Sequence, residues 1–415
     1  MKILFLSPFN CVPANTGNKI LTNGLLQFLS NRHDCDLVLL TDPGESTERT
    51  TESLRNSFPG LSSIQVFDKP AGSRLLQARL RAGMRGEHPA FGRYRNRALL
   101  TSLRRMVASQ DYDVVHIDMM LMAQYAEVCR PLPRVLMASD AYSSAARRAR
   151  NEAAGVRCTA TAMVLEGVFG RYERTQYPRL EAVATVSDAD RDYLQARCPG
   201  ATVMHVGLPL PERYQRLPIR AFATDPQATP RILVTGAISH CAVERTTAEF
   251  LRGAVEYAPA RPDAVVVLGA SPRSGLARLM REASHVTHVS FVDDYDGFLQ
   301  HDWVYVYPQR TGSGLQTKVQ QAMALGLPVV GYDIAFGGLA VQDEVHAFVC
   351  QTDADLHSAV RRLLTDSDLR GRVGTAAANH VRQRFSIGVV GAEMEQVYAR
   401  ARQNVHGGQF WPASC

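Results

Sequence analysis

Short apolar runs recur along the whole chain, and most of them are continuous instead of alternating with polar residues. In the first half of the chain the runs cover residues 2–7, 35–40, 63–67, 112–117, 134–138, 181–186 and 202–206. A continuous apolar run predicts a strand covered on both faces, as in a parallel sheet. Helical patterns lie between the runs, and the one over 18–32 places its large apolar residues on one broad face. This alternation predicts a doubly wound α/β domain.

The pattern pauses over 207–230, a segment with five prolines and little periodicity, which we interpret as a linker. It then restarts, with apolar runs at 231–236, 263–270, 288–292, 303–307, 328–332 and 347–350. We therefore predict a Rossmann-like N-terminal domain over 1–206, a second over 231–385 and a closing C-terminal helix over 386–405. The two domains are expected to face a cleft, with ligands beyond the carboxyl ends of the strands.

Length and composition agree with two globular domains. The chain has 415 residues, which is too long for one ordinary core, and it is 46% apolar and 21% charged. Its eight cysteines form no C-x-x-C pair, so we expect neither a zinc site nor a redox motif, and a reducing cytoplasm fits best. The N-terminal apolar run is too short for a signal peptide, and no run is long enough to span a membrane.

The net charge of +6 does not by itself imply nucleic acid, and none is expected as a partner. The positive charge is concentrated between Arg74 and Arg105, where nine arginines stand against one acid, Glu87. Such a run attracts phosphates or an anionic membrane face. A solvated helical face is an equally good explanation, and the sequence leaves both open.

Several polar residues follow the predicted strands of the first domain. His116 and Asp118 end one strand and share a face, because residues two apart in a strand do so. Asp140 follows the next strand. We expect His116 to contact a sugar hydroxyl or a developing charge, although a structural histidine is the alternative. Asp118 and Asp140 are candidate acceptor-binding residues.

The first strand is not followed by G-x-G-x-x-G, which disfavours a nicotinamide or flavin enzyme. Instead Gly17 and Asn18 open a helix, where backbone N–H groups and the helix dipole can face an anion. A simply capped helix is the alternative. In the second domain Gly236 follows a strand and precedes His240. A glycine there permits close approach of a phosphate, or makes a tight turn only.

The strongest candidate is the stretch that begins at Arg310. Small residues lead into a helix that is expected to begin near Leu315, which suits a diphosphate at the helix N-terminus; they are Thr311, Gly312, Ser313 and Gly314. Lys318, about one turn into the helix, adds positive charge, and Gly326 is expected to end the helix. The spacing is not that of a Walker A motif. Three acids, Asp293, Asp294 and Asp296, are explained as turn and cap residues, and no metal site is predicted.

The stretch "GSGLQTKVQQAMALGLPVVGYD" resembles the donor-binding segment of GT-B glycosyltransferases, specifically family 4, typically G-x-x-K-x-x-E-A-M-A-x-G-x-P-V-V-A. Within that family it is most similar to bacterial sugar transferases associated with exopolysaccharide and exosortase systems. The stretches "PANTGNKILTNGLLQFLS", "YDVVHIDMMLMAQYAE", "ATVSDADRDYL" and "RILVTGAISH" agree in order, so the resemblance covers nearly the whole chain.

The resemblance implies roles for single residues. Gly17 and Asn18 would lie near the donor phosphates, and His116 would contact the sugar as a catalytic residue together with Lys318. The diphosphate would be held around Gly236, His240, Arg310, Thr311, Gly312, Ser313, Gly314, Leu315 and Lys318. The family's two glutamates, which approach the donor sugar and the ribose, correspond to Ser313 and Gln321. Gln321 keeps an amide that can bind ribose hydroxyls.

The implied activity is transfer of a sugar from a nucleotide-diphosphate sugar, with retention, without a metal and without a bound cofactor. The acceptor would be a glycan, a lipid-linked or a small-molecule glycoside, and the arginines over 74–105 would hold the protein at the inner membrane face. Because both glutamates are replaced, a nucleotide-sugar-binding partner subunit with little transfer is an alternative. A nucleotide-sugar epimerase is another, although few paired acids and bases are found for it.

Overall fold

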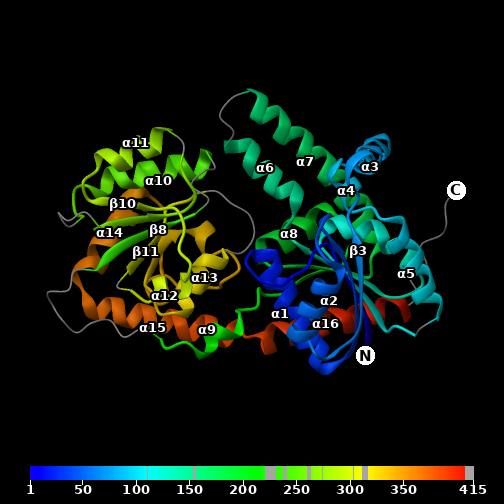
Figure 1. Cartoon of the computed structure of the whole chain (residues 1–415). Helices are drawn as coiled ribbons and strands as arrows, with labels where there is room; N and C mark the ends of the chain where they lie inside the picture. The colour runs from blue at the N-terminus through cyan, green and yellow to red at the C-terminus, as the bar shows by residue number, and fades with distance from the viewer. Residues whose placement is uncertain are drawn as a thin grey trace. The chain divides into compact units, whose positions relative to one another are not determined.

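The computed structural model describes residues 1–109, 111–152, 156–219, 230–236, 241–258, 263–272, 274–301, 303–310 and 316–406. The chain forms two compact units (Figure 1). The first contains Met1–Pro209 and the C-terminal segment from Ile387, and the second contains Leu210–Ser386.

The first unit is built on a parallel sheet of seven strands in the order β3-β2-β1-β4-β5-β6-β7. The strands are β1 Lys2–Ser7, β2 Asp34–Thr41, β3 Leu61–Asp68, β4 Val114–Asp118, β5 Arg134–Ser139, β6 Ala182–Thr185 and β7 Val203–His205. Every predicted strand of this half is present, and the central strands β1, β4 and β5 are buried throughout except at Lys2. Burial on both faces explains why their sequences are continuously apolar.

Helices connect these strands. They are α1 Gly17–Arg32, α2 Thr47–Ser57, α3 Gly72–Met84, α4 Ala90–Arg93, α5 Arg97–Ser109, α6 Tyr142–Glu152, α7 Val156–Gln176, α8 Asp188–Arg197 and, from the chain's end, α16 Ile387–His406, with 3-10 turns η1 Met120–Cys129 and η2 Tyr177–Arg179. α16 packs closely against α1 (Figure 1). A Cβ atom on Gly391 would lie 2.1 Å from the Phe28 ring, so this approach requires glycine. The chain's last helix thus completes the first unit.

The second unit has a parallel sheet of six strands in the order β10-β9-β8-β11-β12-β13. The strands are β8 Arg231–Thr235, β9 Val265–Leu268, β10 Val286–Val289, β11 Trp303–Tyr307, β12 Val329–Tyr332 and β13 Phe348–Cys350. The connecting helices are α9 Glu212–Arg216, α10 Cys241–Ala254, α11 Ser274–Glu282, α12 Tyr295–Leu299, α13 Thr317–Ala324, α14 Asp353–Thr365, α15 Ser367–Arg384 and the 3-10 turn η3 Asp333–Ala335. The predicted strands of this half are again all present.

The boundary between the units differs from the expected linker over 207–230. α9 lies inside that segment, and Leu210 and Tyr214 are fully buried in the core of the second unit. The Leu210 backbone N–H also donates to the Phe385 carbonyl at 2.7 Å. From Leu210 onward the segment therefore belongs to the second unit, because the side chains of Leu210 and Tyr214 complete that core.

Both sheets are doubly wound, with the strand order reversing at one point. The switch lies between β1 and β4 in the first unit and between β8 and β11 in the second. In such sheets ligands bind beyond the carboxyl ends of the strands beside the switch point. Among the described residues, no helix is both long and apolar enough to cross a membrane.

Candidate functional site

Two residues beside the switch point of the first unit have unusual backbone conformations. Met119, directly after β4, has φ of 65°, and Ser139, the last residue of β5, has φ of 62°. Positive φ values are uncommon for residues with a Cβ atom, and such strain clusters at functional sites. The Ser139 hydroxyl is also buried without a hydrogen-bond partner in the described structure. The carboxyl ends of β4 and β5 are therefore the best candidate site of this unit.

Asp118 ends β4, and its side chain contacts β1 and α1. Its side chain is almost fully buried, and its Oδ2 accepts a hydrogen bond from Thr22 Oγ1 at 2.7 Å and a longer one from Ser7 Oγ at 3.4 Å. Removal from water raises the pKa of the carboxyl to about 7, although both hydroxyl donors act in the opposite direction. Asp118 is thus poised to titrate near neutral pH, as a group that exchanges protons with a substrate hydroxyl would be.

His116 does not lie at the strand end, and this part of the expectation is corrected. It is the third of five residues in β4 and is fully buried. Its ring stacks on Phe5 at 4.0 Å between centroids, and Nδ1 lies 2.8 Å from the Tyr398 hydroxyl of α16. Burial lowers the pKa of His116 to about 3, so the imidazole is neutral. Its position is that of a core histidine, and it is Asp118 that occupies the carboxyl end.

Asp140 follows β5 and lies close to a second acid that the sequence interpretation missed. One carboxylate oxygen of Asp140 is buried without a hydrogen-bond partner among the described residues. Burial, and then the negative charge of Asp190, raise the pKa of Asp140 to about 6. Asp190 is itself buried and lies 3.8 Å from the Arg148 guanidinium. Two carboxyls and one arginine therefore meet here, an arrangement suited to binding sugar hydroxyls.

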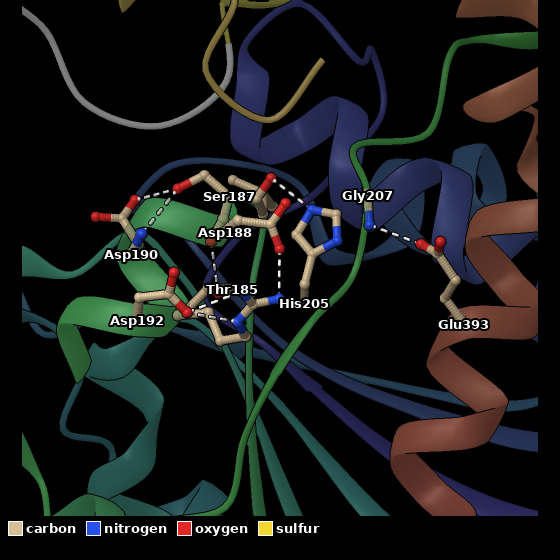
Figure 2. A network of polar contacts seen from close by, with 10 residues as sticks. Thr185, Ser187, Asp188, Asp190, Asp192, His205, Gly207 and Glu393 are labelled. Atoms are coloured by element: carbon tan, nitrogen blue, oxygen red, sulfur yellow. Dashed lines mark hydrogen bonds and ion pairs between the residues drawn. The ribbon is translucent and has the colours of Figure 1, made fainter. Parts of the chain in front are cut away.

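Ser187 explains how Asp190 is held (Figure 2). The Ser187 hydroxyl accepts from the Asp190 backbone N–H at 3.1 Å and donates to its carboxylate at 2.9 Å, which caps α8. The stretch "TVSDAD" carries this cap as a serine followed three residues later by an acid, so the signal was present in the sequence. Nearby, Glu393 of α16 accepts from the Gly207 backbone N–H at 2.8 Å (Figure 2).

The N-terminus of α1 has the features expected of an anion-binding end. The helix begins at Gly17, its Thr16 N-cap makes no side-chain hydrogen bond, and there is no acid in its first turn. Its first N–H groups thus lack an acidic side-chain partner in the helix, which suits an anion. Asn18 is exposed, while its carbonyl accepts from Thr22 at 2.9 Å. The same Thr22 contacts Asp118, so the helix start and the strand end are directly connected.

A buried amide side chain, that of Gln309, lies at the switch point of the second unit between the ends of β8 and β11. It was not identified from the sequence. Gln309, two residues after β11, is 1% exposed and donates from Nε2 to the Thr235 carbonyl at 3.2 Å. Its Oε1 is buried without a partner in the described part of the chain. A Cβ atom on Gly236 would lie 2.7 Å from this Nε2 and 3.2 Å from Val243. Gly236 therefore permits close approach of a side chain of the protein itself.

Gly236→Ala should destabilise the second unit by about 1–2 kcal/mol, because the new methyl group displaces the buried Gln309 amide from Thr235. The free energy of unfolding in urea measures this effect. Gly371→Ala, inside α15, is the contrasting variant: a Cβ atom there meets nothing within 4 Å, so the alanine should stabilise the helix by about 0.5–1 kcal/mol. Equal free energies of unfolding for the two variants would show that the Gln309 side chain can move to another position without loss of stability.

Arg310 has partners within its own unit. Its guanidinium forms an ion pair with Asp353 at the start of α14, lies 3.2 Å from the Tyr332 hydroxyl and stacks over the Tyr332 ring at 4.6 Å. The ion pair holds the pKa of Asp353 below its ordinary value, although hydrogen bonding from Tyr332 is the larger cause. An anionic ligand would have to compete with Asp353 for Arg310.

α13 is the helix whose N-terminus is predicted to face a diphosphate. Its N-cap residue, Gln316, accepts a hydrogen bond from the Tyr307 hydroxyl at 2.5 Å, which ties the helix start to the end of β11. Gly326 has φ of 84° and follows the helix, which confirms it as the terminating glycine. His240 and residues 311–315, which include Thr311, Gly312, Ser313, Gly314 and Leu315, lie outside the described residues.

Lys318 and Gln321 lie on α13, three residues apart and hence on one face of the helix. Lys318 is exposed, and no described carboxylate lies within ion-pair distance of it. Even so, the surrounding protein displaces enough water to lower the pKa of its ammonium group. Gln321 is buried. A ligand with an anionic group and nearby hydroxyl groups could bind both side chains. Its anionic group would pair with the Lys318 ammonium, and its hydroxyl groups would form hydrogen bonds with the Gln321 amide.

The acids near α12 have the roles of cap and ion-pair residues. Asp294 caps the helix by accepting from the Gly297 N–H at 2.9 Å. Asp296 pairs with Arg213 at 2.6 Å and also contacts the Tyr214 hydroxyl. Within the described ranges, no three acid, histidine or cysteine side chains converge as metal ligands would.

Two doubly wound units of this kind define the GT-B class of fold, and comparison with known proteins bears this out. Residues 229–366, which form most of the second unit, match the family described as Glycosyl transferases group 1. Among curated proteins, none matches the chain in sequence. The matched segment includes the predicted donor-site residues Gly236, Arg310, Lys318 and Gln321, whereas Gly17 and Asn18 lie outside it.

Solved structures match over nearly the whole chain. Sucrose-phosphate synthase from Thermosynechococcus elongatus has a TM-score of 0.63 at 17% identity, covering 96% of this chain and 99% of its own. HepE from Anabaena in complex with UDP has a TM-score of 0.64 at 13% identity, covering 96% and 100%. TarM from S. aureus, in complex with fondaparinux, alpha-GlcNAc-glycerol and UDP, has a TM-score of 0.62 at 9% identity, covering 96% and 100%. The chain thus has the GT-B fold, and a segment of its second unit matches the group 1 family model.

Proposed function

We propose that this protein transfers a sugar from a nucleotide-diphosphate sugar to a hydroxyl group of an acceptor. The observation that carries the proposal is the combination on α13 of Lys318, which has no carboxylate within ion-pair distance among the described residues, with a buried Gln321, inside a segment that matches the group 1 family. The solved structures of HepE contain UDP or UDP-glucose, which supports a nucleotide-sugar donor for a chain of the same fold.

In this proposal the second unit binds the donor. Departure of the nucleoside diphosphate is the step that needs help, because negative charge collects on the leaving oxygen. Lys318 would hold that charge, and the N–H groups at the start of α13 would add to it. Gln321, on the same face one turn along, would bind the ribose hydroxyls. Metal independence and retention of configuration remain predictions that rest on the resemblance.

The first unit would bind the acceptor. Its candidate groups are the buried carboxyls of Asp118 and Asp140, to which Asp190 is now added. Hydrogen bonds from acceptor hydroxyls would satisfy the buried oxygen of Asp140 that lacks a partner. A glycan, a lipid-linked glycoside and a small glycoside all present such hydroxyls. His116 has no place in this proposal, because the ring is enclosed by Phe5 and Tyr398.

Thermal unfolding in the presence of UDP, GDP, dTDP, ADP and CMP sugars tests the proposal. The correct donor at about 100 times its Kd should add about 2.7 kcal/mol of stability, which raises the Tm by several degrees. Free monosaccharides serve as the control and should have no effect. If none of the nucleotide sugars raises the Tm, both transfer and the partner-subunit alternative are contradicted, since each requires nucleotide-sugar binding.

A further inference from the structure

The helix α3 has two apolar faces, and only one of them is covered. Ala82 is buried, and the backbone of Ala78 lies so close to Gly92 that a Cβ atom there would be 2.6 Å away. On the opposite face Leu76, Leu80 and Met84 are 61%, 59% and 79% exposed. A spacing of four residues places these three side chains in one stripe along the helix. The stripe points away from the protein.

Arginines border this stripe on both sides. Arg79 lies on one side of it, and Arg74 and Arg81 lie on the other, as the helical period of 3.6 residues requires. The sequence of α3, "GSRLLQARLRAGM", contains no acid. No described carboxylate lies within ion-pair distance of Arg74, Arg79 or Arg81, whereas Arg93 and Arg95 are paired with Asp42 and Glu87. The arginines beside the stripe are therefore members of the arginine run that have no carboxylate partner among the described residues.

α7 extends the exposed apolar area. Val156, Met163 and Val164 on this helix are 86%, 55% and 64% exposed. The C-terminal half of α7 lies beside the segment that follows α3, because Phe169 contacts His88 at 5.2 Å between ring centroids and the Arg171 guanidinium lies against Gly86 (Figure 1). The three exposed apolar residues lie on the N-terminal half of the helix. We call these six apolar residues and the three arginines of α3, Arg74, Arg79 and Arg81, the α3–α7 surface.

The α3–α7 surface differs from an ordinary solvated face. It holds six of the eleven exposed large apolar side chains in the described structure. Clustered exposed apolar residues mark an interaction site, while single ones need no explanation. A second copy of the chain in a symmetric contact would oppose arginine to arginine, which disfavours self-association. A partner with negative charge at its surface and an apolar interior would bind both the arginines and the exposed apolar side chains. An anionic lipid bilayer has both properties.

We propose that the α3–α7 surface docks on an anionic membrane. Leu76, Leu80 and Met84 enter the boundary between headgroups and acyl chains, while the flanking arginines bind lipid phosphates. α7 adds its own exposed apolar side chains, Val156 at its first residue and Met163 and Val164 about two turns further along. Docking of this kind is independent of the transferase activity, because it uses no residue of the donor or acceptor sites.

Co-sedimentation of the full chain with vesicles tests the proposal. Vesicles of phosphatidylglycerol and phosphatidylcholine should bind the protein, and vesicles of phosphatidylcholine alone should bind it at least about tenfold more weakly. Two triple variants, L76S/L80S/M84S and R74Q/R79Q/R81Q, should each lower binding to the anionic vesicles at least about tenfold. The control V255S/F291S/V345S removes three exposed apolar side chains elsewhere, which are 59%, 76% and 40% exposed. It should bind as the wild type does.

Three results would overturn the proposal. The first is a wild-type protein that stays in the supernatant with anionic vesicles, and the second is an L76S/L80S/M84S variant with unchanged binding. The third is sedimentation equilibrium that shows a wild-type dimer converted to monomer by the same serine substitutions, which would assign the surface to a second copy. Because all substituted side chains are exposed, an unchanged Tm should show that each variant is folded.

Discussion

Lys318→Ala is expected to lower turnover at least tenfold and to weaken the binding of nucleoside diphosphate. The charge of Lys318 has no carboxylate partner among the described residues, so a bound diphosphate would be its first close counter-ion. Removing one group that stabilises a developing negative charge typically costs about 100–1,000-fold in kcat. Release of nucleoside diphosphate from the nucleotide sugar measures turnover, and calorimetric titration measures binding.

Two further variants sharpen this test. Lys318→Arg keeps the charge on a differently shaped side chain and should retain part of the activity. Arg278→Ala removes a charge from α11 that is 73% exposed and should leave both readouts unchanged. Wild-type kinetics and binding in Lys318→Ala would show that Lys318 does not bind the diphosphate. That result would also contradict the assignment of the diphosphate site to the start of α13.

Asp118→Asn should change how the stability of the protein depends on pH. The folded-state pKa of Asp118 is raised to about 7 from an ordinary value of 3.8. Between these two values the unfolded chain has lost the proton and the folded chain keeps it. The free energy of unfolding of the wild type should therefore fall as pH rises from about 4 to 7 by roughly 2–4 kcal/mol on account of this one group.

The asparagine variant lacks this titration and can still accept from Thr22 and Ser7. Its stability relative to the wild type should rise over the same pH interval and level off above it. Urea unfolding at successive pH values measures the difference, which also cancels the contribution of Asp140. Asp293→Asn, at an exposed position, is the control and should give no such trend. A difference between Asp118→Asn and the wild type that is flat in pH would contradict the burial assigned to Asp118.

The strands of both units could be predicted because parallel sheets buried on two faces require continuous apolar runs. Gly326 could also be recognised, since a helix followed by Gly-x-Pro has few other endings. The end of the linker was harder to predict from the sequence. Leu210 and Tyr214 have no local periodicity, and their burial depends on a core assembled from strands and helices far along the chain.

The candidate site was predictable where it depends on local pattern and not where it depends on long-range packing. His116 was placed at a strand end, yet Tyr398 of the last helix encloses it, and a contact across 282 positions leaves no signal nearby. Gln309 is a polar residue after a strand like many others, and only its place opposite Gly236 singles it out. Asp190 could have been predicted from the sequence, because Ser187, the serine that caps α8 and binds the Asp190 carboxylate, lies three residues earlier.

The central claim is that the protein breaks the bond between a sugar and a nucleoside diphosphate. Phosphorus NMR follows this directly when the protein is incubated with the nucleotide sugar that most raises its Tm, with mixed glycosides or water as acceptor. The account predicts that nucleoside diphosphate signals grow with time and that Lys318→Ala slows their growth at least about tenfold. A nucleotide sugar that stays intact, either unchanged or with its sugar epimerised, would contradict the account.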